Sequence, residues 1–178
     1  MLCIVLSRRD IREFDQLITF YSRDQGKIEV LARGIKKILS KNSASLAPGN
    51  VVEAEIIAGK ENYILGGVEL WQSFNEHRHN LQSRLFLQWS LSFASVFCAK
   101  ELPDAMMFKL LYRWLKFLNR SASPTILAAD HFARRVLELS GFDPNHDKKI
   151  TNHKSLYTFA IYHAEKHLGD WGNMLIIY

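Results

Sequence analysis

The pattern of hydrophobic residues changes near residue 75, and this change divides the chain into two parts. Before residue 75, apolar residues alternate with polar ones or form short runs that end at turn residues, as in β-strands. After it, they recur every three or four positions, as in amphipathic helices. The pattern therefore predicts an all-β part at residues 1–75 and an all-α part at residues 76–178.

The first part contains short segments with the alternation and composition of strands, at residues 2–6, 17–21, 28–32, 52–56 and 63–71. In the fourth, Val52 and Ala54 share one face while Glu53 and Glu55 share the other, so one face is buried and the other solvated. Five short strands favour a five-stranded, OB-like barrel. An SH3-like barrel would give much the same pattern, and the hydrophobic pattern alone leaves the choice open.

The second part predicts a small helical domain of about four helices, at residues 76–99, 103–118, 123–141 and 153–168. Pro103 and Pro124 are suited to the first turn of the second and third helices. Gly141 is suited to the end of the third helix, since glycine adopts the left-handed conformation of a C-cap. The polar residues 143–151 are expected to form a loop.

Composition and charge place few limits on this picture. The chain has 178 residues, 48% hydrophobic and 23% charged, as in folded globular proteins. No segment approaches the roughly 18 apolar residues of a membrane span, and charge follows the first apolar residues, the reverse of a secretory signal. We therefore expect a cytoplasmic protein without membrane association. Cys3 and Cys98 are isolated and predict neither a disulfide framework nor a Cys-x-x-Cys metal site.

The sequence contains no recognisable catalytic motif. Gly59-Lys60 lacks the remainder of a phosphate-binding loop, and no Gly-x-Ser-x-Gly or His-Glu-x-x-His motif occurs. Glu53 and Glu55 could imitate a carboxylate pair, but the two-residue period makes them the outward face of a strand. We therefore expect a protein that is not an enzyme and has no cofactor.

The histidines of the second part offer a metal site as an alternative. His163 and His167 are four residues apart on a predicted helix, a spacing at which two imidazoles can reach one zinc ion. His146, Asp147 and His153 lie nearby in sequence. Two histidines without cysteine fall short of the four-ligand structural pattern, so no metal is predicted.

The most informative local feature is a basic segment. Residues 30–52 contain no acidic residue but four cations, and two further arginines follow the first predicted strand. The set is Arg8, Arg9, Arg33, Lys36, Lys37 and Lys41. Cations gathered on a barrel and its longest loop would neutralise phosphates. Phe14, Tyr21 and Tyr63 are candidates to stack on bases, although small barrels normally bury their aromatic residues.

Short motifs occur in order along the chain: Ser7-Arg8-Arg9-Asp10, Gly26-Lys27-Ile28, Leu31-Ala32-Arg33-Gly34 and Gly141-Phe142-Asp143-Pro144. Lys36-Lys37 and Ser40-Lys41 follow the third. In this order the motifs resemble the RecO family of bacterial recombination mediators. The resemblance implies an N-terminal OB fold, a helical C-terminal domain, binding of single- and double-stranded DNA, and annealing of complementary strands. It also implies RecR, RecA and the acidic tail of single-stranded-DNA-binding protein as partners, at the bacterial nucleoid.

On the matching positions, the cations of the basic set named above would be the DNA contacts. Two departures stand out: residues 145–152 contain no cysteine where many family members have a four-cysteine zinc element, and the chain is shorter than is usual, so we expect a reduced helical domain. A site for the acidic tail needs cations beside an apolar groove, and Lys116, Arg134 and Arg135 are candidates. An RNA-binding OB module and a basic protein-interaction scaffold stay open as alternatives.

Overall fold

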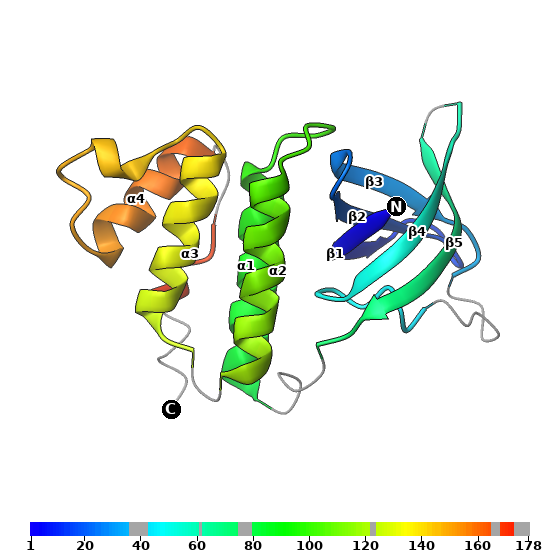
Figure 1. Cartoon of the computed structure of the whole chain (residues 1–178), viewed down its shortest axis with the longest axis horizontal. Coiled ribbons are helices and arrows are strands. Elements are labelled where there is room, and N and C mark those ends of the chain that lie inside the picture. Colours follow the sequence, from blue (N-terminus) through cyan, green and yellow to red (C-terminus); the bar gives the residue numbers. More distant parts are fainter. Residues whose placement is uncertain (36–42, 61, 75–79, 122–123, 165–167, 173–178) are drawn as a thin grey trace. The chain divides into compact units, whose positions relative to one another are not determined.

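The computed structural model describes residues 1–35, 43–60, 62–74, 80–121, 124–164 and 168–172 (Figure 1). Two compact units divide the chain. The first comprises Met1–Phe74 with Ala99–Phe108, and the second comprises Asn75–Cys98 with Lys109–Tyr178. The hydrophobic pattern did not predict that Ala99–Phe108 belong to the same unit as the barrel.

The first unit is a closed five-stranded barrel. Its strands are β1 (Leu2–Asp10), β2 (Gln16–Ser22), β3 (Gly26–Ala32), β4 (Val51–Ala58) and β5 (Tyr63–Gln72). The order around the barrel is β1-β2-β3-β5-β4, in which β3 and β5 run parallel and β4 closes antiparallel on β1. This Greek-key order is that of an OB-like fold, so it decides the choice that the hydrophobic pattern left open.

The barrel core is formed by the side chains that point inward from its strands. Phe20 and Ile18 of β2 are fully buried, as are Val30 of β3 and Val52 of β4. The predicted alternation is therefore confirmed, because Glu53 and Glu55 are exposed between buried neighbours of β4. Burial of these apolar side chains supplies most of the driving force for closing the barrel.

The segment after the first helix packs onto the barrel at the β2–β3 turn. The Glu101 amide donates to the carbonyl of Lys27, at 3.0 Å, and the Lys100 ammonium pairs with Glu29 at 2.5 Å. Gly26 has a φ of 71°, and a Cβ added there would lie 2.2 Å from the carbonyl oxygen of Leu102. Only glycine fits this position, because both the backbone conformation and the close approach exclude a side chain.

The described helices are α1 (Leu81–Phe97), α2 (Ala105–Arg120), α3 (Ile126–Leu139) and α4 (His153–Ala164), with a 3-10 turn at Pro144–His146. Asn80 caps α1 by accepting from the amides of Gln82 and Ser83. The side chain of Asp104 accepts from the amides of Met106 and Met107. The prediction that Pro103 opens the second helix was wrong, because Asp104 satisfies the first amides of a helix that begins after it.

The third and fourth helices also differ at their ends from the prediction. Thr125 caps α3 by accepting from the amide of Ala128, so Pro124 precedes the cap and does not form the first turn. Gly141 has the expected positive φ of 86°. The start predicted at residue 76 lies outside the described residues, as does part of the predicted end of the fourth helix. Within the described residues, no helix combines the length and apolar character that crossing a membrane requires.

Aromatic side chains form the core of the helical unit. Trp89 of α1 is the centre, with Phe86, Phe93, Phe132 and Trp171 around it at ring-centroid distances of 5.0–6.4 Å. Trp171 lies beyond α4 and is fully buried. The residues that follow α4 therefore complete the core, which the helical pattern did not predict.

Candidate nucleic-acid interface

The two arginines of β1 point to opposite faces of the sheet. A β-bulge between Val5 and Ser7 shifts the register, so that Arg8 lies opposite Ile18 and Arg9 opposite Leu17. Directly opposed residues of an antiparallel pair share a face. Because Ile18 belongs to the barrel core, Arg8 lies on the inward side at the end of the barrel, and Arg9 lies on the outer side. Both side chains are exposed.

The basic segment begins directly after β3 and is fixed at its start. Arg33 follows the last residue of β3 and is exposed. Gly34, with a φ of 63°, donates its amide to the carboxylate of Asp15 at 2.8 Å. Ile35 then enters the barrel core and is 5% exposed. The start of the segment is therefore held beside the turn between β1 and β2, where Asp15 lies.

The return of the segment is held at the same end of the barrel. The Arg8 guanidinium donates to the carbonyl of Ser43 at 3.4 Å, and Leu46 is fully buried in the core. The amide of Asn50 donates to the carbonyls of Ala44 and Ser45, at 3.2 and 3.0 Å. Lys36, Lys37 and Lys41 lie outside the described residues, but the chain leaves at Ile35 and returns at Ser43.

Arg8 and Arg33 are therefore brought together at one end of the barrel with both ends of the lysine-bearing segment. Two of the acidic residues there, Asp10 and Asp15, are engaged, while Glu13 is exposed in the same turn as Asp15. The carboxylate of Asp10 accepts from Gln16 at 2.7 Å, and Asp15 holds Gly34 and lies 3.9 Å from Arg12. Among the described residues, neither Arg9 nor Arg33 forms an ion pair. We call the end of the barrel that carries Arg8, Arg9, Arg33 and the two described ends of the lysine-bearing segment the basic end.

The aromatic candidates differ in their accessibility. Tyr21 is 1% exposed, and its hydroxyl donates to the carbonyl of Asp104. Tyr63 is partly buried against the barrel core. Tyr21 is too deeply buried to stack on a base, so that prediction was wrong, whereas Tyr63 lines an open hollow and stays a candidate. Phe14, in the turn between β1 and β2, is 44% exposed and stays a candidate.

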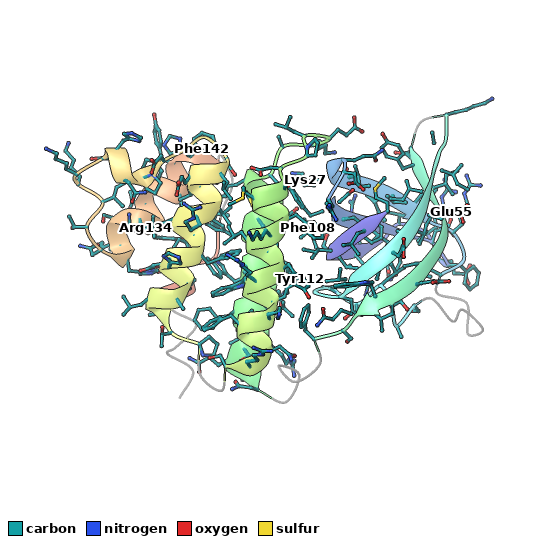
Figure 2. The ribbon with its side chains drawn as sticks, in the orientation of Figure 1. Lys27, Glu55, Phe108, Tyr112, Arg134 and Phe142 are labelled. Carbon is teal, nitrogen blue, oxygen red and sulfur yellow. The ribbon has the colours of Figure 1, made fainter. Side chains whose placement is uncertain are left out.

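The remaining charges of the barrel lie elsewhere. Arg23 lies in the turn at the other end of β2, roughly 20 Å from Gln16 along the strand. On the outer face of β4 and β5, Glu53 lies directly opposite Glu69, and Glu55 is exposed on the same face (Figure 2). The carboxylates of Glu53 and Glu69 repel each other, and they also repel other anions such as phosphates. The barrel therefore separates a basic end from an acidic outer face.

Two of the cations proposed for an acidic tail are engaged within the helical unit. Arg134 donates to the carbonyl of Ile150 at 3.1 Å, and Arg135 pairs with Glu138 at 2.5 Å. Lys116 is different, because it lines an open hollow with Phe117 and Ser121 on the last turns of α2. The structure therefore leaves Lys116 as the one available member of that set.

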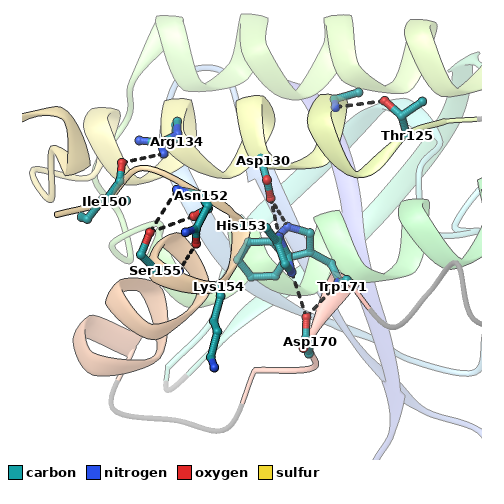
Figure 3. A network of polar contacts seen from close by, with 12 residues as sticks. Thr125, Asp130, Arg134, Ile150, Asn152, His153, Lys154, Ser155, Asp170 and Trp171 are labelled. Atoms are coloured by element: carbon teal, nitrogen blue, oxygen red, sulfur yellow. Dashed lines mark hydrogen bonds and ion pairs between the residues drawn. The ribbon is translucent and has the colours of Figure 1, made fainter. Parts of the chain in front are cut away.

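A histidine between two carboxylates lies where α3, α4 and the last described segment meet (Figure 3). Nδ1 of His153 lies 2.7 Å from Asp130, and Nε2 lies 3.1 Å from Asp170. Burial lowers the pKa of His153, but the hydrogen bonds and negative charges of the two aspartates outweigh it and raise the pKa above 6.5. Both ring nitrogens are engaged, so neither is available as a catalytic base.

The structure also shows the surroundings of His163, a candidate metal ligand, and of the Cys3 thiol. The ring of His163 packs against Phe142, Phe159 and Tyr162 at centroid distances of 4.4–5.1 Å. His167 lies outside the described residues, and the described part of the chain holds no group of three or more metal-ligating side chains. Burial raises the pKa of the Cys3 thiol to about 12. This buried thiol is thus a poor nucleophile.

The fold and its charges define a class: an OB-like barrel with one basic end, followed in the chain by helices. Residues 2–74 match the family model described as "Recombination protein O N terminal". Relatives named DNA repair protein RecO match over more of the chain. The protein of Desulforamulus reducens is 30% identical over 142 residues, covering 80% of this chain and 55% of the relative.

Two further relatives of the same name agree. The protein of Rubrobacter xylanophilus is 30% identical over 146 residues, covering 81% of this chain and 58% of its own length. That of Dehalococcoides mccartyi is 26% identical over 161 residues, covering 90% and 63%. The chain is therefore similar to the RecO family, in its barrel by the family model and over 80–90% of its length by these relatives. It spans between 55% and 63% of the length of these three relatives.

Proposed function

We propose that this chain acts in DNA repair as a recombination mediator, which binds single- and double-stranded DNA and anneals complementary strands without hydrolysing a nucleotide. The observation that carries the proposal is the basic end. Arg8 and Arg33 lie there with both ends of the segment that bears three lysines. The relatives' printed name, DNA repair protein RecO, supports the same role.

The chemistry of annealing suits such a surface. Two complementary strands repel each other through their phosphates, and bound cations reduce this repulsion by displacing counterions. Arginine and lysine contacts to phosphate leave the base edges available for pairing. The acidic outer face of β4 and β5 would keep DNA from the rest of the barrel. Binding is therefore expected to tolerate any sequence and to weaken steeply with salt.

The proposal extends to partners and location. In keeping with the family, the protein would assist RecA loading together with RecR, contact the acidic tail of single-stranded-DNA-binding protein, and work at the bacterial nucleoid in the cytoplasm. Separate pull-down experiments with purified RecR, RecA and the tail peptide test each contact. A partner that is not retained at low salt would be removed from the proposal.

The test of the DNA contact uses Lys36→Glu/Lys37→Glu in the full chain. We expect this double change to weaken binding to DNA oligonucleotides ten-fold or more at low salt, on the order of 1.4 kcal/mol. Arg23→Glu/Lys60→Glu makes the same change of charge away from the basic end, since Lys60 lies between β4 and β5 and lines a hollow with Lys27 and Lys100. This variant should retain most of the binding. An equal loss of DNA affinity in the two variants would contradict the assignment of DNA binding to the loop.

Annealing is measured with two complementary labelled strands, in DNA and in RNA, with and without ATP. We expect annealing of DNA in the absence of ATP. A requirement for ATP would overturn the mechanism, and tighter binding to RNA than to DNA would favour an RNA-binding module instead.

A further inference from the structure

The polar face of α2 is entirely free of acidic residues and carries a line of cations. From Ala105 to Arg120 the helix contains no aspartate or glutamate. Its cations follow one another at intervals of four, three and four residues: Lys109, Arg113, Lys116 and Arg120. At about 100° per residue this spacing places all four within an arc of roughly 60°. We call these four residues the α2 stripe.

The cations of the α2 stripe have no ionic partner in the part of the chain that the structure describes. Among the described residues, Lys109, Arg113 and Arg120 form no ion pair or hydrogen bond through their side chains, and Lys116 contacts only the ring face of Tyr112, at 5.7 Å. On α3, by contrast, Arg134 and Arg135 are both engaged by neighbouring oxygen atoms. The stripe is therefore a row of uncompensated positive charge.

An aromatic side chain lies beside this row. Phe117 is 40% exposed although it is a large apolar residue, and its inner side stacks on Trp114 at 5.3 Å. It lines an open hollow of about 460 Å³ together with Arg113, Lys116, Arg120 and Ser121. A ring held from behind and open in front, with cations around it, provides a platform for a nucleic-acid base.

We propose that the α2 stripe binds a single strand of nucleic acid, with its cations on successive phosphates and Phe117 stacked on a base. The stripe extends over about 16 Å of helix, with roughly 4.5–6 Å between successive cations along the axis. This repeat suits a polymer that carries one charge per nucleotide. Stacking on Phe117 needs an unpaired base, which favours a single strand over a duplex.

This inference deepens the proposed function and rests on its claim that the chain binds nucleic acid, but not on the contact at the basic end. It assigns a second, separate phosphate-binding surface to the helical unit. A protein with two such surfaces can hold two strands at once or one strand at two places. Either arrangement raises the local concentration of one strand near another.

The test compares variants of the full chain by fluorescence anisotropy with a labelled 20-nucleotide poly-dT strand over a salt series. Arg113→Gln/Arg120→Gln removes two stripe cations, and Lys148→Gln/Lys154→Gln removes two exposed cations elsewhere in the helical unit as the matched control. We expect the stripe variant to bind at least five-fold more weakly at low salt. Its slope of log K against log salt should fall by about 1.4, since each phosphate contact on a single strand contributes about 0.7.

Phe117→Ala separates stacking from charge. It should weaken binding to the single strand roughly five-fold or more while leaving the salt slope unchanged. Thermal unfolding followed by circular dichroism checks that each variant is folded. If a variant is not folded, the strand is photo-cross-linked to the unaltered protein instead. The inference then predicts cross-linked peptides from residues 109–121.

Several results would overturn the inference. Binding and slope equal to those of the control variant would do so, and so would the absence of α2 peptides among the cross-links. Loss of binding to an acidic peptide, with oligonucleotide binding intact, would assign the stripe to a protein partner instead. If variants of the basic end bind normally while the stripe variant does not, the proposed barrel contact fails and the α2 contact stands.

Discussion

Replacement of His153 by glutamine tests how much the bridge between Asp130 and Asp170 stabilises the helical unit. Each carboxylate accepts from a different nitrogen of the ring, at 2.7 and 3.1 Å. Both nitrogens donate only when the ring is protonated, so the imidazolium is the form that makes both hydrogen bonds. One glutamine amide cannot span the two carboxylates, and the bridge is therefore broken in His153→Gln.

The magnitude follows from the contacts. Hydrogen bonds to charged groups contribute about 1.5–3 kcal/mol each. The His153 side chain is 26% exposed, so solvent screening places both bonds near or below the lower end of that range. We expect His153→Gln to lower the free energy of unfolding by about 2–3 kcal/mol below pH 6. Lys154→Gln, a neighbouring loss of charge on α4, should change it by less than about 0.5 kcal/mol.

The pH dependence has a defined sign. The pKa of His153 is raised in the folded protein above the 6.5 of an unfolded chain. The stabilisation is therefore fully present below pH 6.5 and is lost as the pH rises through the folded pKa. The other titratable group at the site, Tyr157, has its pKa raised by burial and by Asp170 from an ordinary value of 10, so it stays neutral over this range.

The assay is urea unfolding at intervals from pH 5 to pH 9, followed by tryptophan fluorescence. Trp89, Trp114 and Trp171 belong to the helical unit, so the signal reports mainly on that unit. The native chain should lose stability above pH 6.5, whereas His153→Gln should show a flatter profile. The reasoning is refuted if the native chain and His153→Gln have parallel profiles across this range.

Three further predictions each depend on the surroundings of one residue. Gly26→Ala should destabilise the barrel by about 2 kcal/mol or more, because the added Cβ clashes with the Leu102 backbone and the positive φ is unfavourable for alanine. Gly141→Ala has nothing near the added Cβ and should cost only about 1–2 kcal/mol. Thermal unfolding of the two variants compares these costs. Trp171→Ala should cost about 3–5 kcal/mol in urea unfolding, since the ring is fully buried, and a loss below 1 kcal/mol would place Trp171 outside the core. Cys3 should resist iodoacetamide at pH 8 until the barrel unfolds, because burial raises its pKa to about 12; rapid labelling of the native protein would contradict this.

The barrel could be predicted from the sequence because its strands are short apolar runs or alternate with a two-residue period, as β3 and the first part of β4 do. Val52 and Ala54 are buried and Glu53 and Glu55 are exposed, as the pattern indicated. The order of the strands could not be read in this way. The parallel pairing of β3 with β5, at Val30 and Tyr63, depends on a closure that joins residues far apart in the chain.

The basic end was predicted in composition but not in geometry. The absence of acidic residues between residues 30 and 52 identified the segment, and Arg33 lies as expected beside it. The opposite directions of Arg8 and Arg9 could not be predicted, because a bulge near Leu6 sets the face on which each lies. Tyr21 was misassigned as a stacking residue because an alternating pattern does not show which tyrosines are fully buried.

The helical unit shows what a periodic pattern leaves out. The helices were predicted, but Trp171 and the bridge at His153 lie in or beside segments without periodicity, and long-range packing brings them together. The α2 stripe, by contrast, was visible in the sequence as four cations at helical spacing. The barrel loop gives the stronger signal in the sequence, because its cations lie closer together in the chain.

The most direct test of the central claim is the salt dependence of DNA binding by Arg8→Gln/Arg33→Gln. These two arginines lie at the basic end, and their loss should weaken binding to single-stranded DNA and lower the slope of log K against log salt by about 1.4. Arg23→Gln/Lys60→Gln, away from that end, should leave the slope unchanged. If the two variants give the same slope as the native chain, the basic end of the barrel is not the DNA-binding surface.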